Sequence, residues 1–201
     1  GYVTGQFGKN HLGDRDEFLP TMHGFDEFWG WLYHLNAMEY VEDPDWPKDD
    51  PKAANFAPRN VIHSFALKDG KQKIVDDGPL PTERMKTLDD EVNKHTIDFI
   101  KRAVKEDKPF FTWYCPSRAH VWTHLSDKYK AMLGTNGWGL QEVVMKDLDD
   151  HVGEVLQTLK DLGVDDNTIV VFTSDNGPEI MTWPDGGMTP YRGEKGTTWE
   201  G

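Results

Sequence analysis

The fold class is decided by residues 138–173, which read WGLQEVVMKDLDDHVGEVLQTLKDLGVDDNTIVVFT. Apolar residues recur at steps of three and four over residues 138–162, which predicts an amphipathic helix. Gly163 stands where a left-handed C-terminal cap belongs, and residues 165–167 have the composition of a turn. The β-branched, apolar run 168–173 then predicts a buried strand. Helix, turn and buried strand therefore follow one another.

The same unit occurs earlier in the chain. Residues 88–104 trace a second apolar helical face, with Thr87 as an N-cap and Pro109 as a stop, and residues 110–115 read as a second buried strand. Alternating helices and continuous apolar strands are typical of a sheet that is covered on both faces. The fold class is therefore predicted as α/β, with a mixed, largely parallel sheet flanked by helices on both faces.

The rest of the chain is expected to belong to the same domain. Residues 2–7 predict a third strand. Residues 36–81, rich in Pro, Asp and Lys, are interpreted as an excursion from the sheet, with a hairpin that turns at Asp69 and Gly70. We therefore expect one partial catalytic domain over residues 1–201 rather than two domains.

Composition excludes several classes of function. The chain has 201 residues, 22 of them Lys or Arg and 35 Asp or Glu, so the net charge of −13 argues against nucleic acid or anionic lipid as a partner. Its 10 Phe, 8 Trp and 6 Tyr argue against a disordered acidic chain. No apolar run approaches the ~18 residues of a membrane span. The single cysteine, Cys115, excludes an internal disulfide framework.

Polar side chains follow each predicted strand at its carboxyl end, where ligands bind in open α/β sheets. These residues are Lys9 and His11 after the first strand, His120 after the second, and Asp175 and Asn176 after the third. If the strands are parallel neighbours, all five residues lie along one edge of the sheet. The sequence therefore predicts a site at that edge.

Asp175 and Asn176 offer a carboxylate and an amide oxygen, which are ligands that suit Ca²⁺ or Mg²⁺ better than zinc. Two residues cannot complete a Ca²⁺ shell of about six to eight oxygens, so other ligands must come from elsewhere. The surrounding Ser-Asp-Asn-Gly-Pro run is also ordinary turn chemistry. A zinc site at His120 and His124 is rejected, because Val121 stands where a zinc-protease helix needs Glu.

Four segments in order resemble the sulfatase family of the alkaline phosphatase superfamily, and most of all its bacterial arylsulfatase-type members. They are residues 1–13 (GYVTGQFGKNHLG, with Asn10 where the family usually has Trp), 23–28 (HGFDEF), 173–178 (TSDNGP) and 193–201 (GEKGTTWEG). The resemblance runs over essentially the whole chain. It implies a sulfatase-like fold and hydrolysis of a sulfate ester by a formylglycine nucleophile with a divalent metal ion.

The resemblance also implies roles for individual residues. Lys9 and His11 would hold and deprotonate the nucleophile. His120 and Lys195 would bind the sulfate ester, with His120 as a candidate proton donor to the leaving oxygen. The metal, usually Ca²⁺ and alternatively Mg²⁺, would be held by Asp175 and Asn176. Cations at these places stabilise the charge that grows on the sulfate oxygens, which explains a cationic pocket in an acidic chain.

Cys115 is not interpreted as the nucleophile. The family's pattern is Cys-x-Pro-Ser-Arg and precedes the Gly-Tyr motif, whereas residues 115–118 read CPSR, one residue shorter and far downstream. Cys115 is therefore predicted to be a strand-end residue. The formylglycine is expected to derive from a Cys or Ser before Gly1, with further family sequence after Gly201, so that the 201-residue chain alone is expected to be inactive.

Two alternatives stay open at the level of sequence. One is a phosphonate or phosphate ester hydrolase of the same superfamily, since the substrates differ mainly in charge. The other is a non-catalytic member that binds a sulfated ligand. The expected substrate is a small-molecule or saccharide sulfate ester, and Trp29, Trp31, Trp122 and Trp183 are candidates for stacking on its ring or for the core. The resemblance favours a periplasmic or secreted location.

Overall fold

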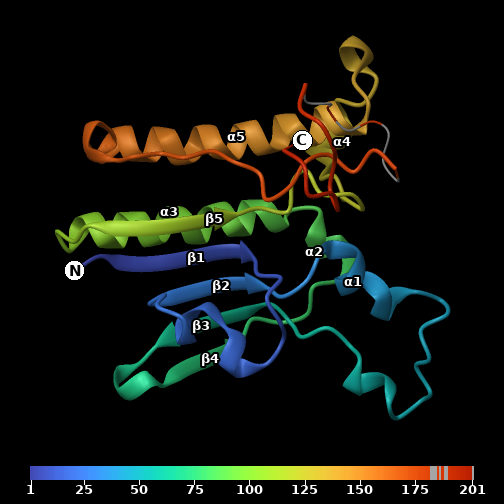
Figure 1. Cartoon of the computed structure of the whole chain (residues 1–201), viewed down its shortest axis with the longest axis horizontal. Helices are drawn as coiled ribbons and strands as arrows, with labels where there is room; N and C mark the ends of the chain where they lie inside the picture. Colours follow the sequence, from blue (N-terminus) through green and yellow to red (C-terminus); the bar gives the residue numbers. More distant parts are fainter. Residues whose placement is uncertain (182–184, 186, 188–189, 201) are drawn as a thin grey trace.

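A mixed sheet in the order β4-β3-β2-β1-β5 lies at the centre of the molecule (Figure 1). The computed structural model describes all residues except 182–184, 186, 188–189 and 201. Its strands are β1 (Val3–Lys9), β2 (Glu27–Trp31), β3 (Ile62–Ala66), β4 (Gln72–Asp76) and β5 (Phe110–Cys115). β1 pairs in parallel with β2 and β5, whereas β2–β3 and β3–β4 are antiparallel. The predicted strands at residues 2–7 and 110–115 are confirmed.

Both predicted helices are present, as α3 (Leu88–Lys105) and α5 (Leu140–Asp161). Gly163 has a φ of 67°, and the N–H groups of Gly163 and Val164 donate to the carbonyls of Lys160 and Leu159, which is the hydrogen-bond pattern of a Schellman cap. Thr87 occupies the N-cap of α3, but its hydroxyl makes no capping bond. The short helices are α1 (Leu35–Glu39), α2 (Thr82–Met85) and α4 (Asp127–Lys130).

The main core lies between the sheet and α3, and α5 packs on α3 (Figure 1). Phe7 and Trp29 face this core, and because side chains alternate along a strand, Phe28 faces the opposite side. There Phe28 packs with Leu19 beside the one-turn 3₁₀ helix of residues 20–22. Within the described residues, the two long helices therefore cover one face only, and the predicted helices on the second face are replaced by single 3₁₀ turns.

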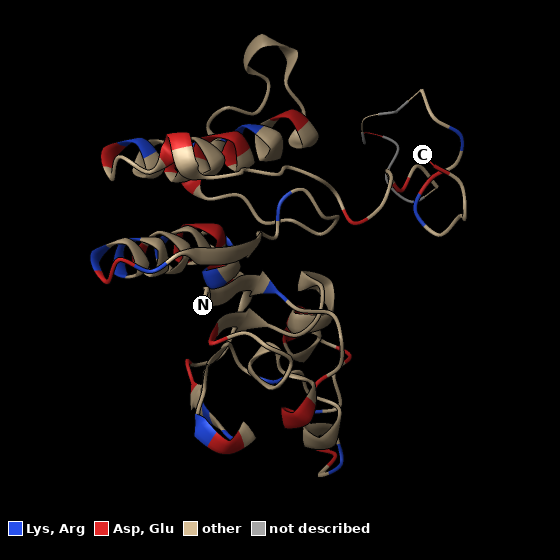
Figure 2. Ribbon diagram, turned by 60° about the vertical axis from the view of Figure 1, so that its left-hand side comes forward, with Lys and Arg blue, Asp and Glu red and all other residues tan. Residues whose placement is uncertain are grey.

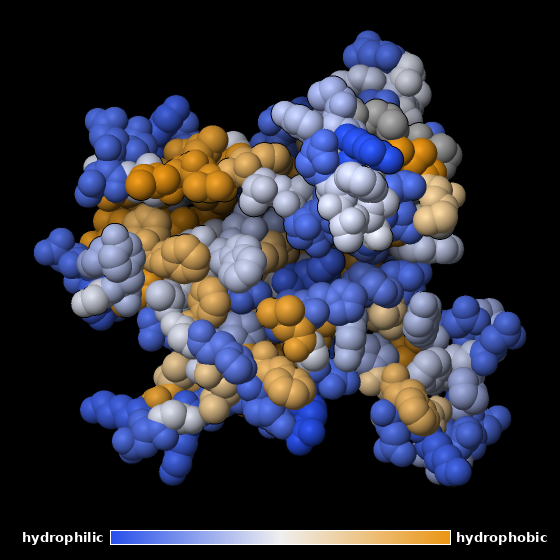
Figure 3. Space-filling model, viewed as in Figure 1, coloured by the Kyte–Doolittle hydropathy of each residue, from blue (hydrophilic) through white to orange (hydrophobic). Residues whose placement is uncertain are grey.

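The predicted strand at residues 168–173 is wrong for this structure. The segment is extended, but it runs alongside α5 and pairs with no described strand (Figures 1 and 2). Ile169 is 93% exposed and Phe172 70% exposed, and hydrophobic surface appears in that region in Figure 3. An apolar, β-branched run favours the extended backbone, but a strand also needs a partner for its N–H and C=O groups, and here the run does not lie on β5.

The hairpin predicted at Asp69 and Gly70 is confirmed. Both residues have left-handed backbone, with φ of 64° and 68°, and they connect β3 to β4. β3 pairs with β2, so the hairpin within residues 36–81 belongs to the sheet rather than lying outside it. None of the helices in the described part of the chain is both long and apolar enough to cross a membrane.

Two glycines let β1 pass closely between its neighbours near the carboxyl ends of the strands. A β-carbon on Gly8 would lie 1.8 Å from the carbonyl oxygen of Cys115 in β5, and one on Gly30 would lie 1.8 Å from the carbonyl oxygen of Gly8. Gly8 also has a φ of 112°, which L side chains rarely adopt. The clashing atoms are backbone atoms, so no rotamer change can relieve the contact.

We therefore expect Gly8→Ala to abolish cooperative folding or to lower the free energy of unfolding by at least ~3 kcal/mol, the scale of combined strain and overpacking. Gly153→Ala is the matched control, because Gly153 lies inside α5 with open space around it. That change is expected to raise stability by ~0.5 to 1 kcal/mol through helix propensity. Urea unfolding followed by circular dichroism measures both, and a wild-type midpoint for Gly8→Ala would show that the backbone contact at Gly8 does not exclude a side chain.

His95 gives the fold a dependence on pH. Its ring stacks on Trp29 at a centroid distance of 4.4 Å, and burial, aided by the positive charge of neighbours, lowers its pKa to about 4. Between that value and the unfolded pKa near ~6.5, the unfolded chain binds a proton that the folded chain does not. Stability should therefore fall as the pH decreases through this window. Urea titrations at several pH values measure this loss of stability. The loss should be smaller in His95→Gln than in the wild type, and it should be unchanged in His23→Gln, because His23 is exposed.

Candidate active site at the carboxyl ends of the strands

Lys9, His11 and His120, three of the residues predicted to form a site, lie at or just after the ends of strands that point toward one edge of the sheet (Figure 1). Lys9 ends β1 and Cys115 ends β5, so that His11 and His120 follow strands that are direct neighbours. Parallel pairing brings the carboxyl ends together, as the sequence analysis expected.

A third histidine, His34, joins the two that the sequence singled out. It follows β2 and its ring lies between the other two, with centroids 5.4 Å from His11 and 5.6 Å from His120, the latter pair stacked at 12°. His34 was not predicted from the sequence, because β2 was not recognised as a strand. The available signal was its place a few residues after a short apolar run, which is also the place of His120 after β5.

Backbone contacts set complementary tautomers on His34 and His120. Nδ1 of His34 accepts a hydrogen bond from the N–H of Ala37 (3.1 Å), so the proton of the neutral ring is on Nε2. Nδ1 of His120 donates to the carbonyl of Val121 (2.8 Å), so Nε2 of the neutral ring is bare. Two stacked imidazoles therefore offer one hydrogen-bond donor and one acceptor.

The pKa values of His11, His34 and His120 are all lowered from the ordinary value. Burial is the largest cause for each, and the positive charges of Lys9 and Lys195 add to it. All three rings are consequently neutral at neutral pH. A bound anion would offset the lysine charges and raise these pKa values again.

Five of the six predicted site residues lie within electrostatic reach of one another. The charges of Lys9, Lys195 and Asp175 act on His11, and those of Lys9 and Lys195 act on His120. Lys195 also forms an ion pair with Glu179 at 3.1 Å. Asn176 follows Asp175 directly in the chain, but its side-chain amide donates to the carbonyl of Gly177 (2.8 Å), and among the described residues it forms no side-chain hydrogen bond with the other five.

The donor set at residues 175–176 fits a hard divalent cation in kind, because both side chains offer oxygen ligands. Asp175 lies near enough to His11 and Cys115 for its charge to affect the pKa of both. Among the described residues, however, no group of three or more His, Cys, Asp or Glu side chains is gathered for a metal. The side chains of Asp175 and Asn176 could therefore supply two oxygen ligands of such a shell.

Of the tryptophans considered for ring stacking, Trp29 and Trp31 are completely buried and belong to the core. Trp122 is 59% exposed and lies two residues after His120. Trp183 lies outside the described residues. Trp122 is thus the candidate that the structure leaves for contact with a substrate ring.

The chain matches known proteins over its whole length. The sequence model of the family described as Sulfatase matches residues 1–201. The chain is 32% identical to N-acetylgalactosamine-6-sulfatase of Homo sapiens over 206 residues, which cover 100% of this chain and 35% of the relative. It is 29% identical to arylsulfatase A of Homo sapiens over 208 residues, which cover 100% of this chain and 38% of that protein.

Solved structures agree in fold. The PsFucS1 sulfatase from Pseudoalteromonas sp. has a TM-score of 0.82 at 34% identity, covering 100% of this chain and 40% of that one. Ps i-CgsB in complex with k-i-k-neocarrahexaose has a TM-score of 0.70 at 26% identity, and the match covers 100% of this chain and 42% of that chain. The chain therefore spans less than half the length of the proteins it resembles.

The rate at which Cys115 is alkylated reports on the electrostatics of this edge, because Cys115 is the chain's single cysteine. Burial raises the pKa of its thiol to about 12, with Lys9 acting in the opposite direction. At pH 8 we expect iodoacetamide to alkylate the folded chain roughly a thousandfold more slowly than the urea-unfolded chain, since only the thiolate reacts. Equal rates in the two states, measured by mass spectrometry, would show that the thiol is neither shielded nor held neutral.

Proposed function

Because the chain belongs to the sulfatase family, we propose that residues 1–201 supply the ester-binding and proton-transfer part of a sulfatase that hydrolyses a saccharide sulfate ester. The observation that carries this proposal is the meeting of three histidines with the charges of Lys9 and Lys195 at one sheet edge. Such a concentration of donors and positive charge in a chain of net charge −13 suits a tetrahedral oxyanion.

Each group has a distinct part in the proposed reaction. Lys9 and Lys195 contribute positive charge toward the sulfate oxygens, and the Nε2–H of His34 adds a neutral donor. The ester's negative charge raises the pKa of His120, so that its Nε2 takes up a proton and delivers it to the leaving oxygen. Proton transfer by a positioned imidazole contributes ~10²- to 10⁴-fold to the rate. His11, neutral beside Lys9, is placed to take a proton from the nucleophile.

The nucleophile is proposed to be a formylglycine formed from a Cys or Ser outside residues 1–201. The buried, neutral Cys115 does not fit this part, because its pKa is raised to about 12. Asp175 and Asn176 would hold a divalent metal, with Ca²⁺ favoured over Mg²⁺. When bound, the metal supplies charge that stabilises the sulfate oxygens.

A saccharide ester is favoured by three observations. The exposed Trp122 stands beside His120, where an aromatic ring can stack on a sugar. One of the similar structures is a complex with a neocarrahexaose. One of the relatives named above is an N-acetylgalactosamine-6-sulfatase, whose name includes a sugar.

The test uses the complete polypeptide that carries residues 1–201, assayed on aryl and saccharide sulfates and on an aryl phosphate. We expect sulfate turnover that exceeds phosphate turnover and a fall of ~10²- to 10⁴-fold in kcat for His120→Ala. His23→Ala, an exposed histidine remote from the edge, should retain wild-type kcat.

The assays on the different substrates separate the proposed sulfatase from the alternative functions. Preferential phosphate turnover would identify the phosphate or phosphonate ester hydrolase, and binding of sulfated sugars without turnover would identify the non-catalytic member. Residues 1–201 alone should be inactive. Turnover by this piece that is lost in His120→Ala would overturn the placement of the nucleophile outside it.

A further inference from the structure

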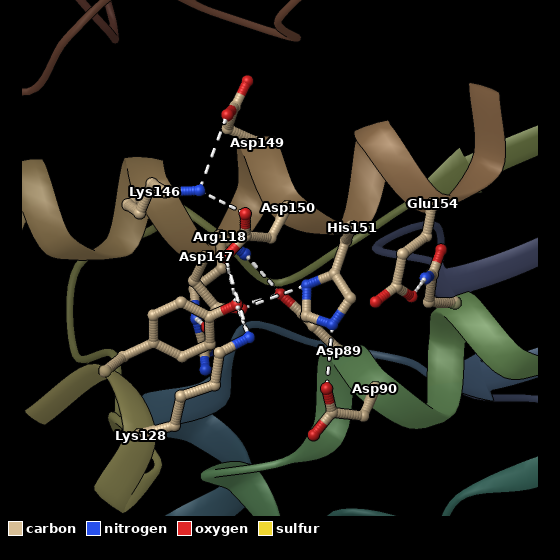
Figure 4. Close-up of polar contacts among 12 residues, drawn as sticks. Asp89, Asp90, Arg118, Lys128, Lys146, Asp147, Asp149, Asp150, His151 and Glu154 are labelled. Carbon is tan, nitrogen blue, oxygen red and sulfur yellow. Dashed lines mark hydrogen bonds and ion pairs between the residues drawn. The ribbon is translucent and has the colours of Figure 1, made fainter. Parts of the chain in front are cut away.

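Four charged side chains are buried together behind the candidate site, and we refer to Asp89, Arg118, Asp147 and His151 as the Arg118 cluster (Figure 4). They come from the first turn of α3, the loop after β5 and the middle of α5. The side chains of Arg118, Asp89 and Asp147 are at most 2% exposed. None of the four had been assigned a role from the sequence.

Arg118 ties two points of one loop together. Its Nη1 donates to Oγ of the neighbouring Ser117 (2.9 Å), and its Nη2 donates to the carbonyl of His124, six residues later (3.0 Å). Its Nε donates to Oδ2 of Asp147 on α5 (2.8 Å). The planar guanidinium therefore fixes both sides of the turn that carries His120 and attaches that turn to a long helix.

Asp89 holds the same loop through its backbone. Its two carboxylate oxygens accept the N–H groups of Ser117 (2.8 Å) and Arg118 (3.1 Å). The N–H of His120 in turn donates to the carbonyl of Ser117 (3.0 Å), so His120 is joined to the held segment by a backbone hydrogen bond. The turn is thus defined by contacts that do not involve the imidazole itself.

His151 supplies the second positive charge of the Arg118 cluster. Its Nδ1 lies 3.0 Å from Oδ1 of Asp147, and its Nε2 lies 2.9 Å from Oδ1 of Asp90. Burial alone lowers the pKa of His151, but the contacts with these two carboxylates outweigh it and raise the pKa to about 10. Within the cluster, two positive groups therefore face two buried carboxylates at neutral pH.

A buried ionic cluster is a poor source of stability, because the cost of removing its charges from water offsets most of their attraction. Its hydrogen bonds converge on residues 117, 118 and 124, on either side of His120. Resting on the proposed function, we propose that Asp89, Arg118, Asp147 and His151 are positioning residues that hold the imidazole of His120 in line with the leaving oxygen of the ester.

The test separates positioning from simple stabilisation by the choice of leaving group. A less stable fold lowers the active fraction equally for every substrate. A misplaced proton donor instead hinders phenyl sulfate, whose leaving phenolate is strongly basic, far more than 4-nitrophenyl sulfate, whose phenolate needs little protonation. Kinetics on the complete polypeptide should be compared for Arg118→Lys, Asp89→Asn and the control Lys146→Gln. Lys146 forms a half-exposed ion pair with Asp150 on α5, apart from the four buried groups (Figure 4).

For Arg118→Lys we expect kcat to fall ~10²-fold on phenyl sulfate and less than ~10-fold on 4-nitrophenyl sulfate, within the range of lost acid catalysis. Lys146→Gln should change neither rate. Adding Arg118→Lys to His120→Ala should cost nothing further, since both changes act through one group. Equal losses on the two substrates, or fully additive losses in the double variant, would overturn the proposal.

A second measurement does not depend on turnover. In nitrogen NMR spectra of the histidine rings, Arg118→Lys and Asp89→Asn should reduce the Nδ1–H tautomer of His120, whereas Lys146→Gln should leave it unchanged. If the wild-type protein hydrolyses no sulfate ester, the proposed function fails and this spectrum decides positioning by itself. An unchanged His120 signal in a folded Arg118→Lys or Asp89→Asn protein would then reject it.

Discussion

The contact on which the rest of the structure depends is the close approach of three strand backbones at Gly8 and Gly30. A β-carbon at either position would lie 1.8 Å from a backbone oxygen of the adjacent strand. Gly8, Gly30 and Cys115 lie near the carboxyl ends of β1, β2 and β5. Because β1 is parallel to both neighbours, the segments that follow the three strands begin at the same edge of the sheet. Lys9, His34 and His120 meet there although they are far apart in sequence. The site is therefore a consequence of strand direction and of two missing side chains.

The electrostatics of the molecule are arranged around that edge. The chain has a net charge of −13, and Asp and Glu positions are frequent along α5 in Figure 2. The edge itself carries Lys9 and Lys195, and these charges together with burial keep the neighbouring imidazoles neutral. A neutral imidazole in these surroundings accepts a proton more readily once negative charge arrives beside it. The same surroundings that lower the pKa values in the free protein thus make protonation respond to an anionic ligand.

Some elements could be predicted because their causes are local. Apolar spacing identified α3 and α5, Gly163 identified the end of α5, and Asp69 with Gly70 identified the hairpin. The run 168–173 was predicted wrongly as a buried strand because its composition reports a preference for extended backbone and carries no information about a pairing partner. His34 and the Arg118 cluster were missed for a related reason. His34 stands in no motif, and Arg118 was considered only as part of the CPSR run at residues 115–118; the partners of both come from distant segments of the chain.

By itself the sequence determined the two long helices, the strands β1 and β5, the hairpin that joins β3 to β4, the resemblance to sulfatases and the residue types available for the site, since each depends on neighbours along the chain. Only the tertiary structure decided that Gly8 must lack a side chain, that His34 lies between His11 and His120, and that Arg118 is buried against Asp147. It also left Ile169 and Phe172 exposed rather than in the sheet. Local spacing specifies helices and turns, whereas strand pairing, burial and pKa depend on which distant segments meet.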